Sequence, residues 1–174
     1  SGLEALYWAQ KYPEEVEAIV GLDMAVPDYY DEMNINIPIM KLGQYGAALG
    51  ITRWIPSLAE SDAIKYGTLS EKEKEIYRAV FYQITATVTM INETKAVKQN
   101  ANIVKENGIP QVPMLLFIYD GSGGTGFTKE KWRSIPENYI SGCDNAGYIE
   151  LDCPHYVHDY KYDEISKEIR KFIQ

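Results

Sequence analysis

The sequence contains 174 residues, of which 45% are hydrophobic and 24% charged, and this composition is typical of one globular domain with its own core. A formal net charge of -8 disfavours nucleic acids and anionic membranes as partners, because an acidic surface repels phosphate groups before any specific contact forms. No window reaches the roughly 18 apolar residues of a membrane span. We therefore expect a small neutral or cationic ligand and no membrane contact from this segment. No signal-peptide pattern opens the sequence, which leaves the localisation undecided.

Three apolar segments are predicted to be strands of a parallel sheet that is covered on both faces. Residues 17–23 and 112–119 are nearly continuous apolar runs, and residues 148–152 form a weaker third. A helix is expected over residues 3–12, because apolar side chains lie on more than one side of its helical pattern. An amphipathic helix is expected after the last strand. The side chains on its apolar face are those of Ile165, Ile169 and Phe172.

Between the first two strands, residues 27–107 are rich in tyrosine and helical by pattern, which predicts an inserted layer of helices. Ser70 followed by Glu73 fits a capping box at the start of one of these helices. The β-branched run at residues 85–89 is expected to bend or interrupt the same helix. The apolar face of the helix that starts at Ser70 consists of Ile76, Tyr77, Val80, Phe81 and Ile84.

Two stretches are rich in glycine. Gly43, Gly46 and Gly50 lie among apolar residues, a pattern that fits either a close-packed helix or a hinge. Residues 121–126 follow the second strand, and exposed backbone N–H groups in such a loop are able to hold a phosphate. No complete phosphate-binding motif is present. A loop that turns sharply at the end of the strand is the favoured interpretation.

Cys143 and Cys153 are the only two cysteines, and they flank the third predicted strand. A strand between them tends to hold their side chains apart, which disfavours a disulfide. Their spacing matches no metal or redox motif. We therefore predict two free, buried thiols.

His155 and His158 are the only histidines and, with Asp159, form an HxxHD pattern after the third strand. On a helix, such a pattern is able to hold a metal ion. The alternative is one functional histidine and one that packs or caps a helix start. We favour this alternative, with His155 functional and neither metal nor cofactor bound, because open α/β sheets place ligand-facing residues just after their strands.

Two segments resemble parts of the α/β-hydrolase family. Residues 2–23 are similar to the family's segment after the nucleophile elbow, with a Gly, a helix ending at Tyr-Pro-Glu and a strand ending in Asp. Residues 152–155 (Asp-Cys-Pro-His), with the helix that follows, look like the catalytic-histidine loop and the closing helix. The resemblance covers the whole chain in the right order. It implies the C-terminal portion of an α/β-hydrolase fold, with three parallel strands and flanking helices, in which residues 1–26 and 108–174 form the core portion and residues 27–107 a helical cap.

The resemblance places the nucleophile outside this chain. With Gly2 aligned to the family pattern, Ser1 falls on the last glycine of GxSxG, two positions after the nucleophile. Ser1 is not itself the nucleophile, because Leu3 stands where the tight turn of the elbow needs a small residue. The N–H groups of the oxyanion hole belong to the missing part as well. We therefore expect the parent protein to be a hydrolase and this chain alone to be inactive.

The resemblance also implies an acid that orients His155, and two carboxylates compete for that role. In the commonest family pattern the acid closes a Gly-x-x-Asp after the penultimate strand, and this sequence has Ser122 at that place. Asp120 lies two residues earlier and is one candidate. Asp23, at the end of the first strand, matches the place of the acid in some haloalkane dehalogenases and is the candidate that we favour. The alternative for both is a structural role as a strand-end or turn aspartate.

These features together predict a hydrolase of small ester-like substrates that uses a nucleophile–His–acid triad. Without the nucleophile, a serine esterase cannot be told from an aspartate-nucleophile dehalogenase or epoxide hydrolase. A non-enzymatic binding protein on the same fold is the alternative of a different class, and an HxxHD metal enzyme is a third.

Several aromatic residues of the predicted cap are candidates for the substrate pocket, although we expect most of them to be core. They are Tyr29, Tyr30, Tyr45, Trp54, Tyr77, Phe81 and Tyr82.

The resemblance has a consequence for assembly. The strand at residues 17–22 is expected to border a strand that this chain lacks. An open strand edge is a template for pairing with another chain. We therefore expect a second copy of the chain to pair along this edge, or the cap to cover it.

Overall fold

The structure is a computed structural model, and the residues it describes are 2–65, 67–121 and 126–174. The chain divides into two compact units. One unit combines Ser1–Met33 with Lys98–Gln174, and the other is Asn34–Val97. The unit that holds the sheet takes in the start of the inserted segment, because Tyr29 is buried there and donates its hydroxyl to Trp132 O over 2.8 Å.

Three parallel strands form the sheet, in the order β1 (Ile19–Leu22), β2 (Met114–Ile118) and β3 (Ala146–Glu150). A parallel sheet with flanking helices puts the chain in the α/β class. The strand β2 is buried along its whole length, as its continuous apolar run predicts. The strand β3 begins two residues before the predicted strand at residues 148–152. The register between β2 and β3 pairs the first residue of β2 with Ala146.

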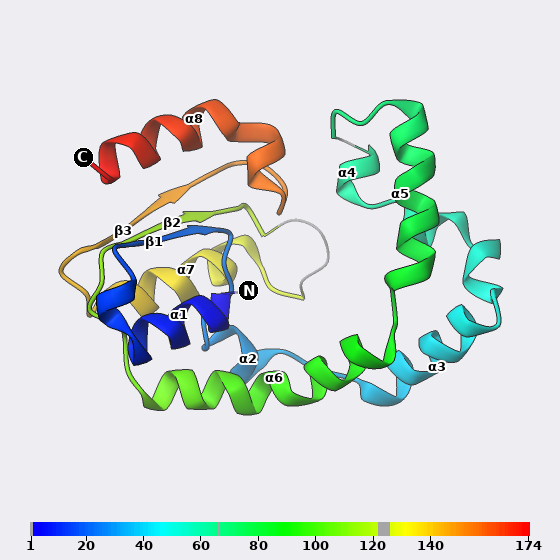
Figure 1. The fold of residues 1–174 in the computed structure, drawn as a ribbon, viewed down its shortest axis with the longest axis horizontal. Coiled ribbons are helices and arrows are strands. Elements are labelled where there is room, and N and C mark those ends of the chain that lie inside the picture. The colour runs from blue at the N-terminus through cyan, green and yellow to red at the C-terminus, as the bar shows by residue number, and fades with distance from the viewer. Residues whose placement is uncertain (1, 66, 122–125) are drawn as a thin grey trace. The chain divides into compact units, whose positions relative to one another are not determined.

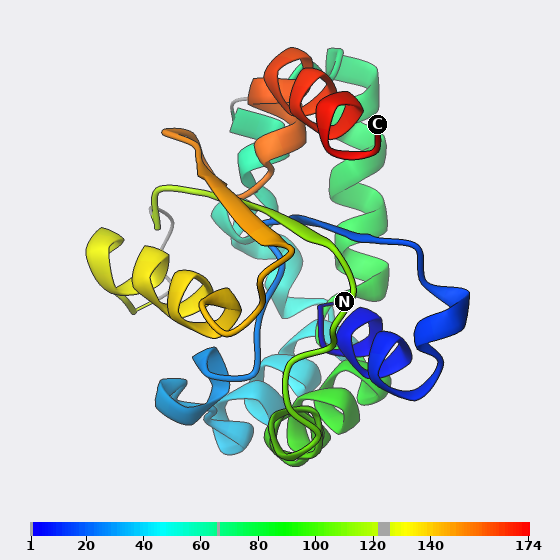
Figure 2. The same cartoon turned by 90° about the vertical axis from the view of Figure 1, so that its left-hand side faces the viewer.

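Helices cover both faces of the sheet (Figure 1, Figure 2). The helix α8 (Val157–Phe172) lies on one face, and α1 (Gly2–Lys11) lies with α7 (Lys129–Ile140) on the other. The sequence patterns predict α1 and α8. Because apolar side chains from three layers meet on the two faces of β2, the core of this unit is centred on that strand.

The helix α7 is an element that the sequence analysis misses. It begins after Thr128, whose side-chain oxygen accepts a hydrogen bond from Lys131 N over 3.2 Å. Pro136 stands inside the helix and interrupts the usual helical composition. The buried residues of α7 nevertheless follow helical spacing, and they are Trp132, Ile135, Pro136, Tyr139 and Ile140.

The remaining elements are short or belong mainly to the second unit. They are η1 (Pro13–Glu15), α2 (Tyr29–Glu32), α3 (Ile37–Ala48), η2 (Ile51–Trp54), η3 (Pro56–Ala59), α4 (Asp62–Lys65), α5 (Glu71–Ile84) and α6 (Val88–Glu106), which runs from the second unit into the first. In the described part of the chain, none of the helices combines the length and the apolar character needed to cross a membrane.

Local predictions for the inserted helices are confirmed. The capping box at the start of α5 is complete, with both reciprocal bonds between Ser70 and Glu73. The helix is interrupted at residues 85–89, where Ala86 has a φ of 57° before α6 begins. Gly43 and Gly46 lie inside α3, but no residue of this helix is buried, so the stretch is helical without the close packing that the pattern suggests. Gly50 lies after the helix with a φ of 75°.

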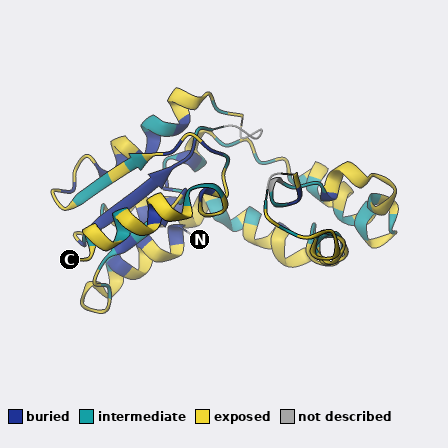
Figure 3. Cartoon of the chain, turned by 90° about the horizontal axis from the view of Figure 1, so that it is seen from above, coloured by how far each residue is buried: buried dark blue, intermediate teal, exposed yellow. Residues whose placement is uncertain are grey.

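The second unit consists mostly of exposed and half-buried residues, drawn yellow and teal in Figure 3, and many of its large apolar residues are exposed. The helix α3 has no buried residue, and Trp54 is 84% exposed. The expectation that most of the cap aromatics are core is therefore wrong. Of the seven, Tyr29 alone is buried, Tyr45 and Trp54 are exposed, and the other four are half-buried. On α5, the apolar face is likewise uncovered at Ile76 and Ile84.

Both cysteines are free and buried, as predicted. Cys143 precedes β3 and Cys153 follows it, so the strand separates the two thiols. Burial raises the pKa of the Cys153 thiol above its ordinary value. This thiol is therefore protonated near neutral pH and is a poor nucleophile.

The outer edge of β1 has no strand beside it among the described residues. The N–H groups of Ile19 and Asp23 point toward β2, where they donate to Pro113 O and Phe117 O. Because backbone groups alternate along a strand, those of Val20 point to the opposite side. This edge therefore offers unpaired N–H and C=O groups to another strand.

We expect the isolated chain to self-associate along the edge of β1. The variant Val20→Pro should reduce this association, because proline removes an N–H on the outer side and leaves the bonds to β2 intact. Light scattering over a range of concentrations measures the mass of both proteins, and circular dichroism checks that the variant keeps its fold. A wild-type chain that stays monomeric at every concentration contradicts the prediction.

Candidate active site

Three residues with acid–base side chains follow the carboxyl ends of the strands. Asp23 comes directly after β1, Asp120 lies just beyond β2, and His155 lies in the loop between β3 and α8. Since the strands are parallel, their carboxyl ends meet at one edge of the sheet, where open α/β sheets bind ligands.

The carboxylate of Asp23 is buried and held by donors from two other elements. Its side chain is 2% exposed. Its Oδ1 accepts a hydrogen bond from Trp132 Nε1 at 3.1 Å and a longer one from Tyr119 N at 3.4 Å. The backbone of Asp23 has a φ of 50°, in the left-handed region, which aspartate tolerates better than most residues. Such an unusual conformation at a strand end is a common feature of functional sites.

The second oxygen of this carboxylate contacts His155. Asp23 Oδ2 lies 2.5 Å from His155 Nδ1. The histidine side chain is 54% exposed, so a buried acid is paired with an imidazole that reaches solvent. When the Nδ1–H group donates a hydrogen bond to the carboxylate, the neutral imidazole has its lone pair on Nε2. This arrangement suits a general base, because the carboxylate fixes the tautomer and stabilises the charge formed on protonation.

Among the described contacts, one of the two candidate carboxylates reaches His155. The acid bonded to Nδ1 of His155 is Asp23, whereas Asp120 is half-buried and its backbone N–H donates to Cys153 O over 3.4 Å. His158 lies on α8, with its Nε2 3.6 Å from Asp159 Oδ1. The contact predicted between Asp23 and His155 is thus present, and their catalytic roles stay predictions.

Two other sequence features concern this edge of the sheet, the HxxHD pattern and the glycine-rich loop. Within the described residues, no group of three or more His, Cys, Asp or Glu side chains is placed to hold a metal ion. His155 precedes α8 and His158 lies within it, so the two imidazoles do not share a helix face. Residues 122–125 of the glycine-rich loop, with Ser122, lie outside the described residues.

Aromatic side chains enclose the buried carboxylate. Tyr29 stacks on Trp132 with ring centroids 4.2 Å apart, and Tyr119 meets Trp132 edge-on at 5.1 Å. Tyr119 also packs edge-on against His155 at 5.6 Å. Burial, followed by the charge of Asp23, raises the pKa of Tyr29 far above its ordinary value. Tyr29 is therefore a neutral hydrogen-bond donor.

Trp132 is the residue at this site that the sequence analysis does not identify. Two local features of the sequence indicate the helix that carries Trp132. Thr128 is a good N-cap, and the apolar residues that follow have helical spacing. Pro136 masks that signal. Even with α7 predicted, its contact with Asp23 depends on the tertiary structure, since 109 positions separate the two residues.

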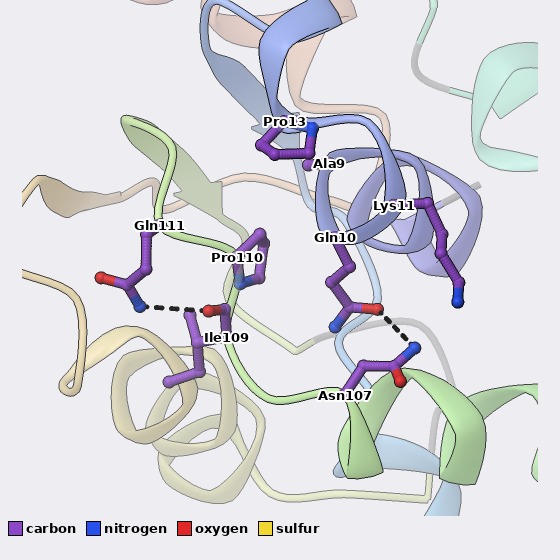
Figure 4. Close-up of a pocket in the computed structure, with 8 residues that line it drawn as sticks. All are labelled: Ala9, Gln10, Lys11, Pro13, Asn107, Ile109, Pro110 and Gln111. Atoms are coloured by element: carbon purple, nitrogen blue, oxygen red, sulfur yellow. Dashed lines mark hydrogen bonds between the residues drawn. The ribbon is translucent and has the colours of Figure 1, made fainter.

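A groove of about 330 Å³ lies between the end of α1 and the segment that leads into β2 (Figure 4). Its lining includes amide side chains, and Asn107 Nδ2 donates to Gln10 Oε1 over 3.3 Å. Lys11 is the one charged residue in its lining. Because Pro13 and Gln111 precede β1 and β2, the groove lies at the amino ends of the strands, away from Asp23 and His155. The groove therefore brings no acid–base pair to a ligand.

Comparison with known proteins yields weak similarities. No family model matches the chain. An uncharacterised protein of Bacillus subtilis (strain 168), YbdG, is 28% identical over 183 residues, which cover 100% of this chain and 55% of the relative. The chain thus spans about half the length of the curated relative it matches. The crystal structure of wild-type DBJA (Type II, P21) is similar with a TM-score of 0.48 and 16% identity, over 98% of this chain and 64% of that chain. This likeness is too weak to carry a functional conclusion.

Proposed function

We propose that this chain supplies the base and the acid of an α/β-hydrolase that cleaves small ester-like substrates. The observation that carries the proposal is the contact between the buried carboxylate of Asp23 and Nδ1 of His155 at the carboxyl end of a parallel sheet. Burying a charged carboxylate is costly unless it has strong partners. The burial of the Asp23 carboxylate therefore calls for a functional explanation, and the orientation of a catalytic imidazole is one.

The proposed mechanism uses a nucleophile from residues that precede Ser1 in a longer protein. His155 Nε2 takes the proton of the nucleophile as it attacks the ester carbonyl, and Asp23 stabilises the imidazolium. The imidazolium then returns the proton to the leaving alcohol. Water completes the cycle by the same base catalysis on the acyl intermediate. On this proposal the 174-residue chain alone is inactive, and no cofactor takes part.

We expect the longer protein to show a burst of product with a p-nitrophenyl ester, followed by a slower steady state. The burst arises because acylation of the nucleophile by an activated ester is faster than hydrolysis of the acyl intermediate, which therefore accumulates. Mass spectrometry of the quenched protein should show one acyl group on a residue upstream of Ser1. The 174-residue chain, assayed in parallel, controls for hydrolysis by exposed side chains. A longer protein that neither turns over esters nor is acylated favours the non-enzymatic binding protein.

The place of the acid favours a second candidate within the same fold. Asp23 follows β1, which resembles the arrangement of haloalkane dehalogenases, whose nucleophile is an aspartate. Single turnover of a haloalkane or an epoxide in oxygen-18 water separates the two candidates. An aspartate nucleophile acquires oxygen-18 in its carboxylate, whereas a serine nucleophile does not.

A further inference from the structure

Trp132 is the only one of the chain's three tryptophans that is buried. Trp8 and Trp54 are exposed, whereas Trp132 is buried and its Nε1 donates to Asp23 Oδ1 over 3.1 Å. A buried indole N–H needs an acceptor, and a buried carboxylate needs donors. The other described donor to this oxygen, Tyr119 N, is at 3.4 Å and so makes the weaker bond. The indole is therefore the main partner of Oδ1.

Two tyrosine rings pack against the indole of Trp132. Tyr29 stacks on it and also donates its hydroxyl to the backbone carbonyl of Trp132 over 2.8 Å. Tyr119 packs edge-on against it. The next residue, Arg133, donates to Tyr119 O and Leu151 O, at the carboxyl ends of β2 and β3. These bonds attach α7 to the same edge of the sheet that carries Asp23 and His155.

We propose that Trp132 is a positioning residue, which holds Oδ1 of Asp23 so that Oδ2 faces Nδ1 of His155. The inference rests on the proposed function. The two carboxylate oxygens contact different partners, Trp132 and His155, so the indole bond sets the rotation of the carboxylate about its Cβ–Cγ bond. Without that bond, the carboxylate turns more freely and the imidazole loses its fixed orientation. Catalysis depends on such orientation, since small misplacements cost large factors in rate.

The hydrogen bond is testable in this chain without any assay of activity. In a proton–nitrogen NMR spectrum, the chain gives three indole N–H signals, and Trp132→Phe identifies one of them. We expect the Trp132 signal to exchange slowly with solvent and to move in Asp23→Asn, whereas those of Trp8 and Trp54 exchange quickly and stay in place. If Asp23→Asn does not fold, the exchange rates of the wild-type chain decide the point. A Trp132 indole that exchanges as fast as that of Trp54 overturns the proposal.

Kinetics in the longer protein test the positioning role itself. We expect Trp132→Phe to lower kcat by about 10- to 100-fold with little change in KM, because the aromatic ring remains and only the hydrogen bond is lost. The exposed Trp8→Phe is the matched control and should leave both constants unchanged. A Trp132→Phe variant with wild-type kcat overturns the proposal while leaving the function of His155 and Asp23 intact. If the wild-type longer protein has no turnover, the proposed function fails, and the NMR result still decides whether the indole holds Asp23.

Discussion

His155→Ala should lower kcat of the longer protein by about 10⁴-fold or more, because the variant has no base to take the proton of the nucleophile. KM should change little, since the imidazole is proposed to act on the transition state rather than on substrate binding. Steady-state kinetics with a p-nitrophenyl ester measures both constants. Circular dichroism of the variant checks that the loss does not come from unfolding.

The matched control is His158→Ala. His158 is the only other histidine, lies three residues away and has a side chain of nearly equal exposure. It is placed beside Asp159 on α8, so its removal should change kcat by less than about twofold. Equal losses from the two variants contradict the assignment of His155 as the base. They point instead to a site that needs both histidines, such as the HxxHD metal site.

Asp23→Asn should lower kcat by about 10⁴-fold. The asparagine keeps the size of the side chain but loses the negative charge that stabilises the imidazolium. Its amide group also favours the wrong tautomer of His155 when its NH2 faces Nδ1. The expected loss is therefore one of catalysis, and kcat as a function of pH with a p-nitrophenyl ester measures it.

Asp120→Asn is the matched control for this prediction. Asp120 lies at the same edge of the sheet and was the competing acid in the sequence, but the described bond of its backbone is to Cys153 O. We expect this variant to keep kcat within a few-fold of the wild type. A larger loss from Asp120→Asn than from Asp23→Asn would reverse the assignment of the acid.

Local features of the fold follow from the sequence because neighbouring residues produce them. The apolar runs predict β1 and β2, and β2 is buried at every position as such a run requires. In β1 only Ile19 and Gly21 are buried and Leu22 is exposed, so this strand is not covered on both faces as expected. The capping box at Ser70 and Glu73 and the break at residues 85–89 are likewise interactions within a few positions. The same local logic places His155 in the loop after the last strand.

The contacts of Asp23 with His155 and Trp132 depend on tertiary structure. Asp23 and Asp120 both follow apolar strands, and the sequence favours Asp23 only through its resemblance to the place of the acid in some haloalkane dehalogenases. The contact of Asp23 with His155 spans 132 positions, and its contact with Trp132 spans 109. Both contacts arise from the parallel register that brings the ends of β1, β2 and β3 together, with α7 attached across them.

Burial of the inserted helices is a second feature that the sequence leaves open. Helical spacing of aromatic side chains predicts one apolar face but not what covers it. In the structure, Tyr29 packs against Trp132, whereas Tyr45 and Trp54 stay exposed in the other unit. The sequence therefore determined the strands, the capping box at Ser70 and the position of His155. The tertiary structure decided which carboxylate contacts this imidazole and which aromatic rings lie around the pair, because those contacts depend on the packing of elements far apart in the chain.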